Sequence, residues 1–206
     1  MITDYASLQS TIADYLGRSD LTTQIQTFIN QAESRIYQNL RVAPMEKAIA
    51  LTVSATGSAP VPSDYIAMRE LYLLDVNGQP YQQMERTTPF WIHQNFNATN
   101  SQGDPYYFAR EGTNFIFAPW QSANTSLGGI YWARLPSLST TNTTNWLTTS
   151  NPNLILTGAL LEAATYLDDQ PGVQYWTSRF EQSQADAQST DDLERMSGSP
   201  PVMRRG

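Results

Sequence analysis

The residues that could perform acid–base or nucleophilic chemistry are few in this chain. His93 is the only histidine, so any serine–histidine–aspartate arrangement would need it as the base. No Gly-x-Ser-x-Gly sequence accompanies it, and it lies beside Phe90, Trp91 and Phe96 in a predicted short helix. Packing or surface polarity explains such a histidine, so we predict no catalytic role for it.

Five acidic residues could in principle supply the two carboxylates that a glycosidase holds across a cleft. They are Asp64, Glu70, Glu85, Asp104 and Glu111. Most of them lie in predicted turns, where acidic residues are common, and nothing in the sequence marks a cleft. The sequence therefore predicts no catalytic residue and no enzyme. A carbohydrate-active hydrolase is the enzymatic alternative.

Metal and phosphate sites are not predicted either. The chain has no cysteine, which excludes disulfides, thiolate metal sites and cysteine nucleophiles. Asp191, Asp192 and Glu194 lie on a predicted helix rather than in a tight loop, so we interpret them as a solvated helix face and not as a calcium site. Gly128-Gly129 lies in a predicted strand with no Lys-Ser/Thr after it, which indicates a bulge or a close backbone approach. We expect no cofactor.

Three aromatic clusters could stack sugars or bases, namely Phe90-Trp91, Tyr106-Tyr107-Phe108 and Tyr131-Trp132. Successive side chains of a strand point to opposite faces, so about half of such residues belong to a core. We favour core packing over ligand binding for these clusters.

Helical periodicity occurs at both ends of the chain. Residues 3–16 and about 21–40 form two predicted amphipathic helices, the second capped by Ser19 or Asp20. Further helices are predicted at about 153–168 and 171–195. The first of these has small residues that allow close helix approach, and the second ends with two apolar anchors. The small residues are Gly158, Ala159, Ala163 and Ala164, and the anchors are Leu193 and Met196.

Between these helices the apolar period becomes two, as in half-buried strands. Asn77-Gly78 and Glu111-Gly112 each predict a hairpin turn, and Thr88-Pro89 predicts the start of a short helix near 88–96. The predicted strands cover about 49–53, 71–76, 79–84, 106–110, 115–118 and 127–135. We therefore predict an α+β fold, in which N- and C-terminal helix hairpins (1–46 and 136–196) form a helical bundle and 47–135 form an inserted antiparallel β module.

Composition restricts the partners. The 206 residues carry a net charge of −7 and only one lysine, Lys47, so no basic stripe for nucleic acid is present. No run of about 18 apolar residues occurs, and Met1–Tyr5 lacks the start of a secretory signal, so we expect no membrane span and no secretion.

The last residues, 197–206, predict an extended C-terminal tail that becomes ordered against a partner or against a neighbouring subunit. Consecutive prolines favour a stiff, extended segment, the two residues after them are apolar, and two arginines can pair with carboxylates. These predicted docking residues are Pro200, Pro201, Val202, Met203, Arg204 and Arg205.

The order of several motifs resembles the head-to-tail adaptor proteins of tailed bacteriophages, in the longer form with a β insertion found in short-tailed phages. The motifs, spread over nearly the whole chain, are Phe28-Ile29-Asn30-Gln31-Ala32-Glu33, Pro62-Ser63-Asp64-Tyr65-Ile66, Pro105-Tyr106-Tyr107, Phe117-Ala118-Pro119, Leu135-Pro136-Ser137-Leu138 and Thr144-Asn145-Trp146-Leu147.

The resemblance implies a structural protein of the virion, without catalysis, assembled in the host cytoplasm. Such adaptors form a homo-oligomeric, dodecameric ring between the portal protein and the tail or nozzle proteins, and the genome DNA passes through without specific binding. In such a ring we expect the C-terminal tail to become ordered against the portal of the virion or against a neighbouring subunit. Another phage tail-completion or decoration protein is the alternative within this class.

Overall fold

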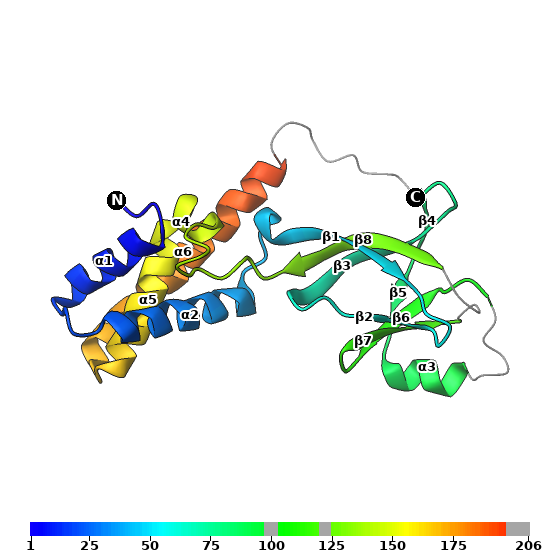
Figure 1. Ribbon diagram of the computed structural model, residues 1–206, viewed down its shortest axis with the longest axis horizontal. Helices are drawn as coiled ribbons and strands as arrows, with labels where there is room; N and C mark the ends of the chain where they lie inside the picture. Colours follow the sequence, from blue (N-terminus) through cyan, green and yellow to red (C-terminus); the bar gives the residue numbers. More distant parts are fainter. Residues whose placement is uncertain (97–102, 120–124, 197–206) are drawn as a thin grey trace. The chain divides into compact units, whose positions relative to one another are not determined.

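The computed structural model describes residues 1–96, 103–119 and 125–196 (Figure 1). These residues form a mixed α+β structure with six α-helices and two four-stranded sheets. The chain divides into two compact units, one made of Met1–Met45 and Arg134–Gly206 and the other of Glu46–Ala133. We call them the helical unit and the sheet unit, and each is described by itself.

Five of the helices belong to the helical unit. They are α1 (Tyr5–Leu16), α2 (Thr22–Asn39), α4 (Trp146–Thr149), α5 (Pro152–Tyr166) and α6 (Gln170–Met196). The four long helices lie where they were predicted, to within a few residues at each end. The capping prediction for α2 was wrong, because its N-cap is Leu21 without a side-chain hydrogen bond, while Asp20 instead pairs with Arg18 at 2.7 Å.

Helix α5 is the centre of the helical unit and contacts α1, α2, α4 and α6. Its residues are buried on most sides, and Leu160 is only 1% exposed. A Cβ atom added at Gly158 would lie 3.0 Å from the Cβ of Ala32 on α2 and 3.2 Å from the ring of Phe180 on α6. The predicted close approach at this small residue is confirmed, since both neighbouring helices need the space.

The end of α6 differs from the prediction. Leu193 and Met196, expected to be apolar anchors, are 70% and 75% exposed. The buried residues in this half of the helix are Ala187 and Asp191, because they continue the helical stripe from Phe180.

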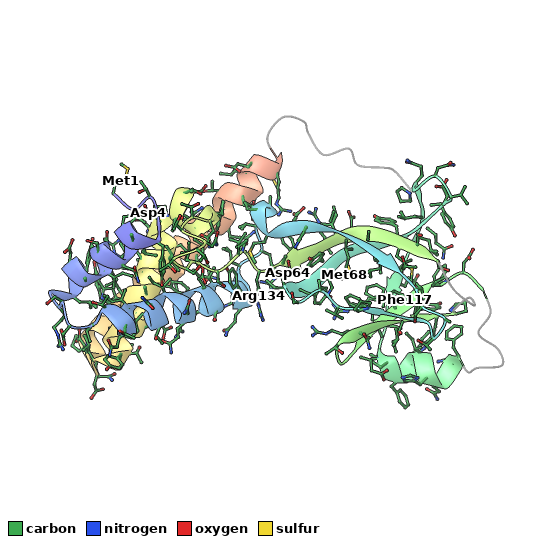
Figure 2. All side chains as sticks on the ribbon, in the orientation of Figure 1. Met1, Asp4, Asp64, Met68, Phe117 and Arg134 are labelled. Carbon is green, nitrogen blue, oxygen red and sulfur yellow. The ribbon has the colours of Figure 1, made fainter. Side chains whose placement is uncertain are left out.

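The sheet unit contains two sheets that share one hydrophobic core. The first has the order β1 (Glu46–Thr52), β8 (Ser126–Ala133), β3 (Tyr65–Leu74) and β4 (Pro80–Gln83). The second has the order β2 (Ser58–Pro60), β7 (Asn114–Ala118), β6 (Tyr107–Glu111) and β5 (Glu85–Arg86). Leu71 and Leu127 from the first sheet and Phe115 and Phe117 from the second belong to the same buried cluster. Phe117 is labelled in Figure 2.

Both predicted hairpin turns are present. Gly78 and Gly112 have φ angles of 76° and 58°, which glycine adopts without strain. The short helix is α3 (Pro89–Asn95), and its N-cap Thr88 accepts a hydrogen bond from the backbone N–H of Trp91 at 3.2 Å, as expected. Strand pairing is antiparallel except between β5 and β6, which run parallel, so the purely antiparallel expectation was wrong for this pair.

Gly129 on β8 lies where three strands meet, opposite Ile49 of β1 and Leu71 of β3. A Cβ atom there would lie 2.9 Å from the Cα of Leu71 and closer still to the carbonyl oxygen of Glu70. The register of β3 on β8 also shifts at Met68/Glu70. The predicted close backbone approach is therefore confirmed.

Candidate functional site

The predicted docking residues of the tail, Pro200, Pro201, Val202, Met203, Arg204 and Arg205, lie outside the described residues. Their sequence is known, and the helix that precedes them ends at Met196.

His93 lies on α3 with a mostly exposed side chain. Its Nε2 atom is 2.9 Å from Oε1 of Glu111 on β6, also mostly exposed. Two exposed partners of this kind form a surface pair, which contributes little to stability.

Asp64 has a structural environment within the sheet unit. Its carboxylate accepts hydrogen bonds from Lys47 Nζ at 2.7 Å and from the hydroxyl of the buried Tyr131 at 2.8 Å. Burial raises the pKa of Asp64, but these two hydrogen bonds outweigh it and hold the pKa below its ordinary value. The carboxylate is thus ionised and engaged, and it serves to satisfy a buried hydroxyl.

The other predicted acid–base candidates are not brought together into a catalytic set. Glu70 accepts from the Tyr72 hydroxyl at 3.1 Å, and Asp104 accepts from the Tyr81 hydroxyl at 3.4 Å. Across the part of the chain that the structure describes, no group of three histidine or acidic residues could hold a metal ion.

A buried carboxylate that sequence reasoning missed lies in the helical unit. Glu33 on α2 is 2% exposed, and its Oε1 atom accepts hydrogen bonds from the Leu138 backbone N–H at 3.1 Å and from Asn145 Nδ2 at 3.3 Å. Burial raises the pKa of Glu33, and these hydrogen bonds only partly oppose that effect. Its place four residues after the buried Ile29 was the available signal.

Glu33 therefore fixes the connector, which we define as residues 134–151. Asn145 has a second role there, because its side-chain oxygen accepts from the backbone N–H of Leu147 at 3.0 Å and caps α4. The predicted helices did not include α4, since four residues are too few for a periodic pattern.

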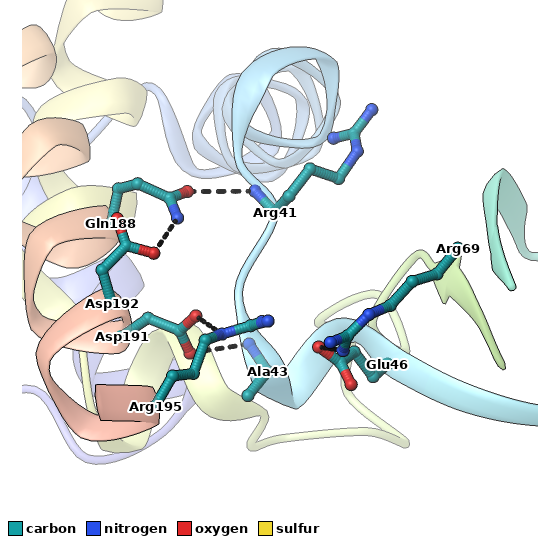
Figure 3. A network of polar contacts seen from close by, with 8 residues as sticks. All are labelled: Arg41, Ala43, Glu46, Arg69, Gln188, Asp191, Asp192 and Arg195. Carbon is teal, nitrogen blue, oxygen red and sulfur yellow. Dashed lines mark hydrogen bonds and ion pairs between the residues drawn. The ribbon is translucent and has the colours of Figure 1, made fainter. Parts of the chain in front are cut away.

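A second buried carboxylate, Asp191 on α6, holds the segment that follows α2 (Figure 3). It is 4% exposed and accepts a hydrogen bond from the Ala43 backbone N–H at 2.7 Å and from Arg195 Nε at 2.5 Å. Beside it, Gln188 Oε1 accepts from the Arg41 backbone N–H at 3.4 Å. The interpretation of Asp191 as part of a solvated face was wrong, because it continues the buried stripe of α6. Asp192 is exposed as expected.

The described surface of the helical unit has two further features of note. The first is an open polar groove of about 540 Å³ between α2 and α5, in which Arg35 pairs with Glu162 at 2.7 Å. The second, which we call the aromatic patch, consists of Tyr15 on α1 and Tyr175, Trp176 and Arg179 on α6. The groove is occupied by this ion pair, and the aromatic patch exposes tyrosine surface to solvent.

A sequence model of the family described as "SU10 adaptor protein" matches residues 3–205, nearly the whole chain. The chain belongs to the SU10 adaptor protein family. This membership bears out the resemblance to head-to-tail adaptors and indicates a structural role for the protein.

No curated protein matches the chain. Within the described residues of this family member, no helix is both long and apolar enough to cross a bilayer.

Proposed function

We propose that the protein is a head-to-tail adaptor of a tailed bacteriophage, which forms a ring between the portal protein and the tail or nozzle proteins. The observation that carries the proposal is the match to an adaptor family over residues 3–205. The ring is a homo-oligomer, dodecameric as in the adaptors that the chain resembles. It is a component of the virion at the head–tail interface and assembles in the host cytoplasm.

The proposed organisation assigns the ring body to a helical bundle of residues 1–46 and 136–196 and a projecting β module to 47–135. It is supported by the division of the chain into two compact units with a boundary close to these positions. Two polar anchors at buried carboxylates, Glu33 and Asp191, tie the chain segments next to that boundary to the helices. Such buried and satisfied polar groups favour one defined arrangement of the segments they hold.

Charge supports passage of DNA without binding. The net charge is −7, and phosphates are attracted mainly by clustered lysine and arginine side chains. A channel surface drawn from this composition repels the DNA backbone and lets it slide.

Co-sedimentation tests the proposal. Purified protein mixed with the portal protein of its phage should form a complex with several copies of the chain per portal ring, and the chain should not sediment alone at that position. A variant lacking residues 199–206 should keep its melting temperature, because the tail follows the last helix, and should bind portal more weakly. Absence of any complex with the full chain would overturn the proposed function.

A further inference from the structure

The aromatic patch on the helical unit contains two tyrosine side chains that are mostly exposed to solvent. Tyr15 and Tyr175 are 61% and 53% exposed, and both lie edge-on to Trp176, with centroid distances of 6.0 and 4.8 Å. The Arg179 guanidinium lies 5.7 Å from the centre of the Tyr175 ring. Both tyrosines therefore keep more than half of their surface in solvent.

Exposed tyrosine and tryptophan rings of this kind suit a proline-rich ligand. Grooves lined by tyrosine and tryptophan bind proline-rich segments in the polyproline II conformation, because the segment is stiff beforehand and its proline rings lie flat on aromatic faces. This chain contains one consecutive proline pair followed by apolar residues, Pro200-Pro201-Val202-Met203. The chemistry of the patch and that of the tail are therefore complementary.

Carboxylates that can pair with the arginines of the tail also lie at this end of the helical unit. Tyr15 touches Trp176, so the end of α1 and the start of α6 meet here, together with the turn between α5 and α6. These segments carry Asp14, Asp168 and Asp169, while the nearby Arg18 is already paired with Asp20 and Arg179 lies over the Tyr175 ring. Arg204 and Arg205 follow the proline pair at a spacing of about 9 Å in a polyproline helix, so they can reach such carboxylates.

The length of the chain decides which copy of the tail reaches the patch. Met196 lies twenty residues beyond Trp176 on the same helix, which is about 30 Å at 1.5 Å per residue, and α6 spans the helical unit from end to end (Figure 1). Pro201 follows Met196 by five residues, which extend to at most about 18 Å. The proline pair therefore cannot reach the patch of its own chain.

We propose that the aromatic patch is the docking site for the Pro200-Pro201 segment of a neighbouring copy of this chain. The inference rests on the proposed function, since it requires neighbouring copies in a ring. It assigns the tail to the joint between subunits, and each subunit thereby donates one tail and receives another.

Cysteine pairing tests this directly, because the natural chain contains no cysteine. One preparation of the protein carries Val202→Cys, and a second preparation carries Ser178→Cys. Ser178 is exposed on α6, three residues after Tyr175 of the patch. Any mixed disulfide then joins two different chains. The matched control is Ser189→Cys, also an exposed serine of α6, which lies on the same helix face about three turns further along.

After the two preparations are mixed with portal and oxidised, the 202–178 disulfide should form at least about fivefold faster than the 202–189 disulfide, as expected where one defined contact dominates binding. Adding Tyr175→Ala to the second preparation, or Pro200→Ala with Pro201→Ala to the first, should remove this preference. Circular dichroism checks that the exposed Tyr175 substitution leaves the helices intact.

Electron microscopy of the same samples separates the two proposals. Rings on portal without preferential 202–178 pairing would overturn the docking site and leave the proposed function standing. Equal pairing at both serines, or a preference that survives the alanine substitutions, has the same meaning. Failure to form any ring would overturn the proposed function, and the docking site with it.

Discussion

Replacing Glu33 by alanine removes the carboxylate that holds the connector against α2. The Leu138 N–H and Asn145 Nδ2 both donate to this carboxylate, at 3.1 and 3.3 Å, and Leu138 is itself buried. Without Glu33 the buried Leu138 N–H loses its acceptor, whereas the half-buried Asn145 Nδ2 keeps only its second acceptor, the Pro136 carbonyl at 3.0 Å. The change therefore acts on the fold of the helical unit and on the position of α4.

The magnitude follows from two opposed effects. Each hydrogen bond to a charged acceptor contributes about 1.5–3 kcal/mol, and two are lost. Removing the carboxylate also removes the unfavourable free energy of burying its charge, which offsets part of this loss. We expect Glu33→Ala to lower the free energy of unfolding by about 2–4 kcal/mol, which is roughly 4–16 °C in melting temperature.

Glu33→Gln separates the two effects. The amide oxygen can still accept from Leu138 and Asn145, while the buried charge is gone, so the variant should stay within about 1 kcal/mol of the natural protein at pH 7. Glu181→Ala is the control, since this glutamate is exposed on α6 and its loss should change stability by less than about 0.5 kcal/mol.

The pH dependence of stability gives a further signature. Burial raises the pKa of Glu33 above its ordinary value of 4.5. As the pH falls, the folded protein binds a proton at Glu33 before the unfolded chain does. Protonation of Glu33 therefore increases the free energy of unfolding as the pH falls from the raised pKa to about 4.5, where the unfolded chain is protonated too. The natural protein should therefore gain stability relative to Glu33→Gln as the pH falls through that window.

Urea denaturation followed by circular dichroism at 222 nm measures these differences, because most helices belong to the helical unit. If Glu33→Ala is as stable as Glu181→Ala, or if the difference between the natural protein and Glu33→Gln does not depend on pH, the reasoning about this buried carboxylate is refuted.

Other substitutions test the remaining parts of the structure. Leu160→Asp places an unpaired charge in the centre of α5 and should cost about 3–5 kcal/mol in thermal denaturation; a cost under 1 kcal/mol would contradict its central position. Gly129→Ala has no room between β1 and β3 and should destabilise the sheet unit by more than about 2 kcal/mol, whereas Gly128→Ala, which would meet only the flexible end of Leu74, should cost less. His93→Ala and Asp64→Ala should leave portal binding intact, with about 1–2 kcal/mol lost for Asp64 because the Tyr131 hydroxyl loses its acceptor. A hydrolytic activity that disappears in either variant would contradict the non-enzymatic role.

Local signals in the sequence predicted much of the secondary structure. Each of these correct predictions rests on one local cause, which acts within a few residues or along one helix. This holds for the turn glycines, the Thr88 cap and the small residue at Gly158. The same holds for the close approach at Gly129, where a glycine in a strand pattern indicates a neighbouring backbone.

The buried carboxylates could not be predicted from such signals. Glu33 and Asp191 find their partners 105 and 148 residues away in sequence, Leu138 in the irregular connector and Ala43 at the start of a short 3-10 helix. An acidic residue on a helix is usually solvated, and only the position of these two on the buried stripe pointed inward. The parallel pairing of the two-residue strand β5 is likewise set by tertiary contacts and not by local sequence.

Electron microscopy of the protein mixed with its portal tests the central claim most directly. Class averages should show an additional ring of this chain on one face of the portal, with twelvefold symmetry and an open channel on its axis. Monomers scattered over the portal or the head shell, or a closed plug without a channel, would contradict the role of a ring-forming head-to-tail adaptor.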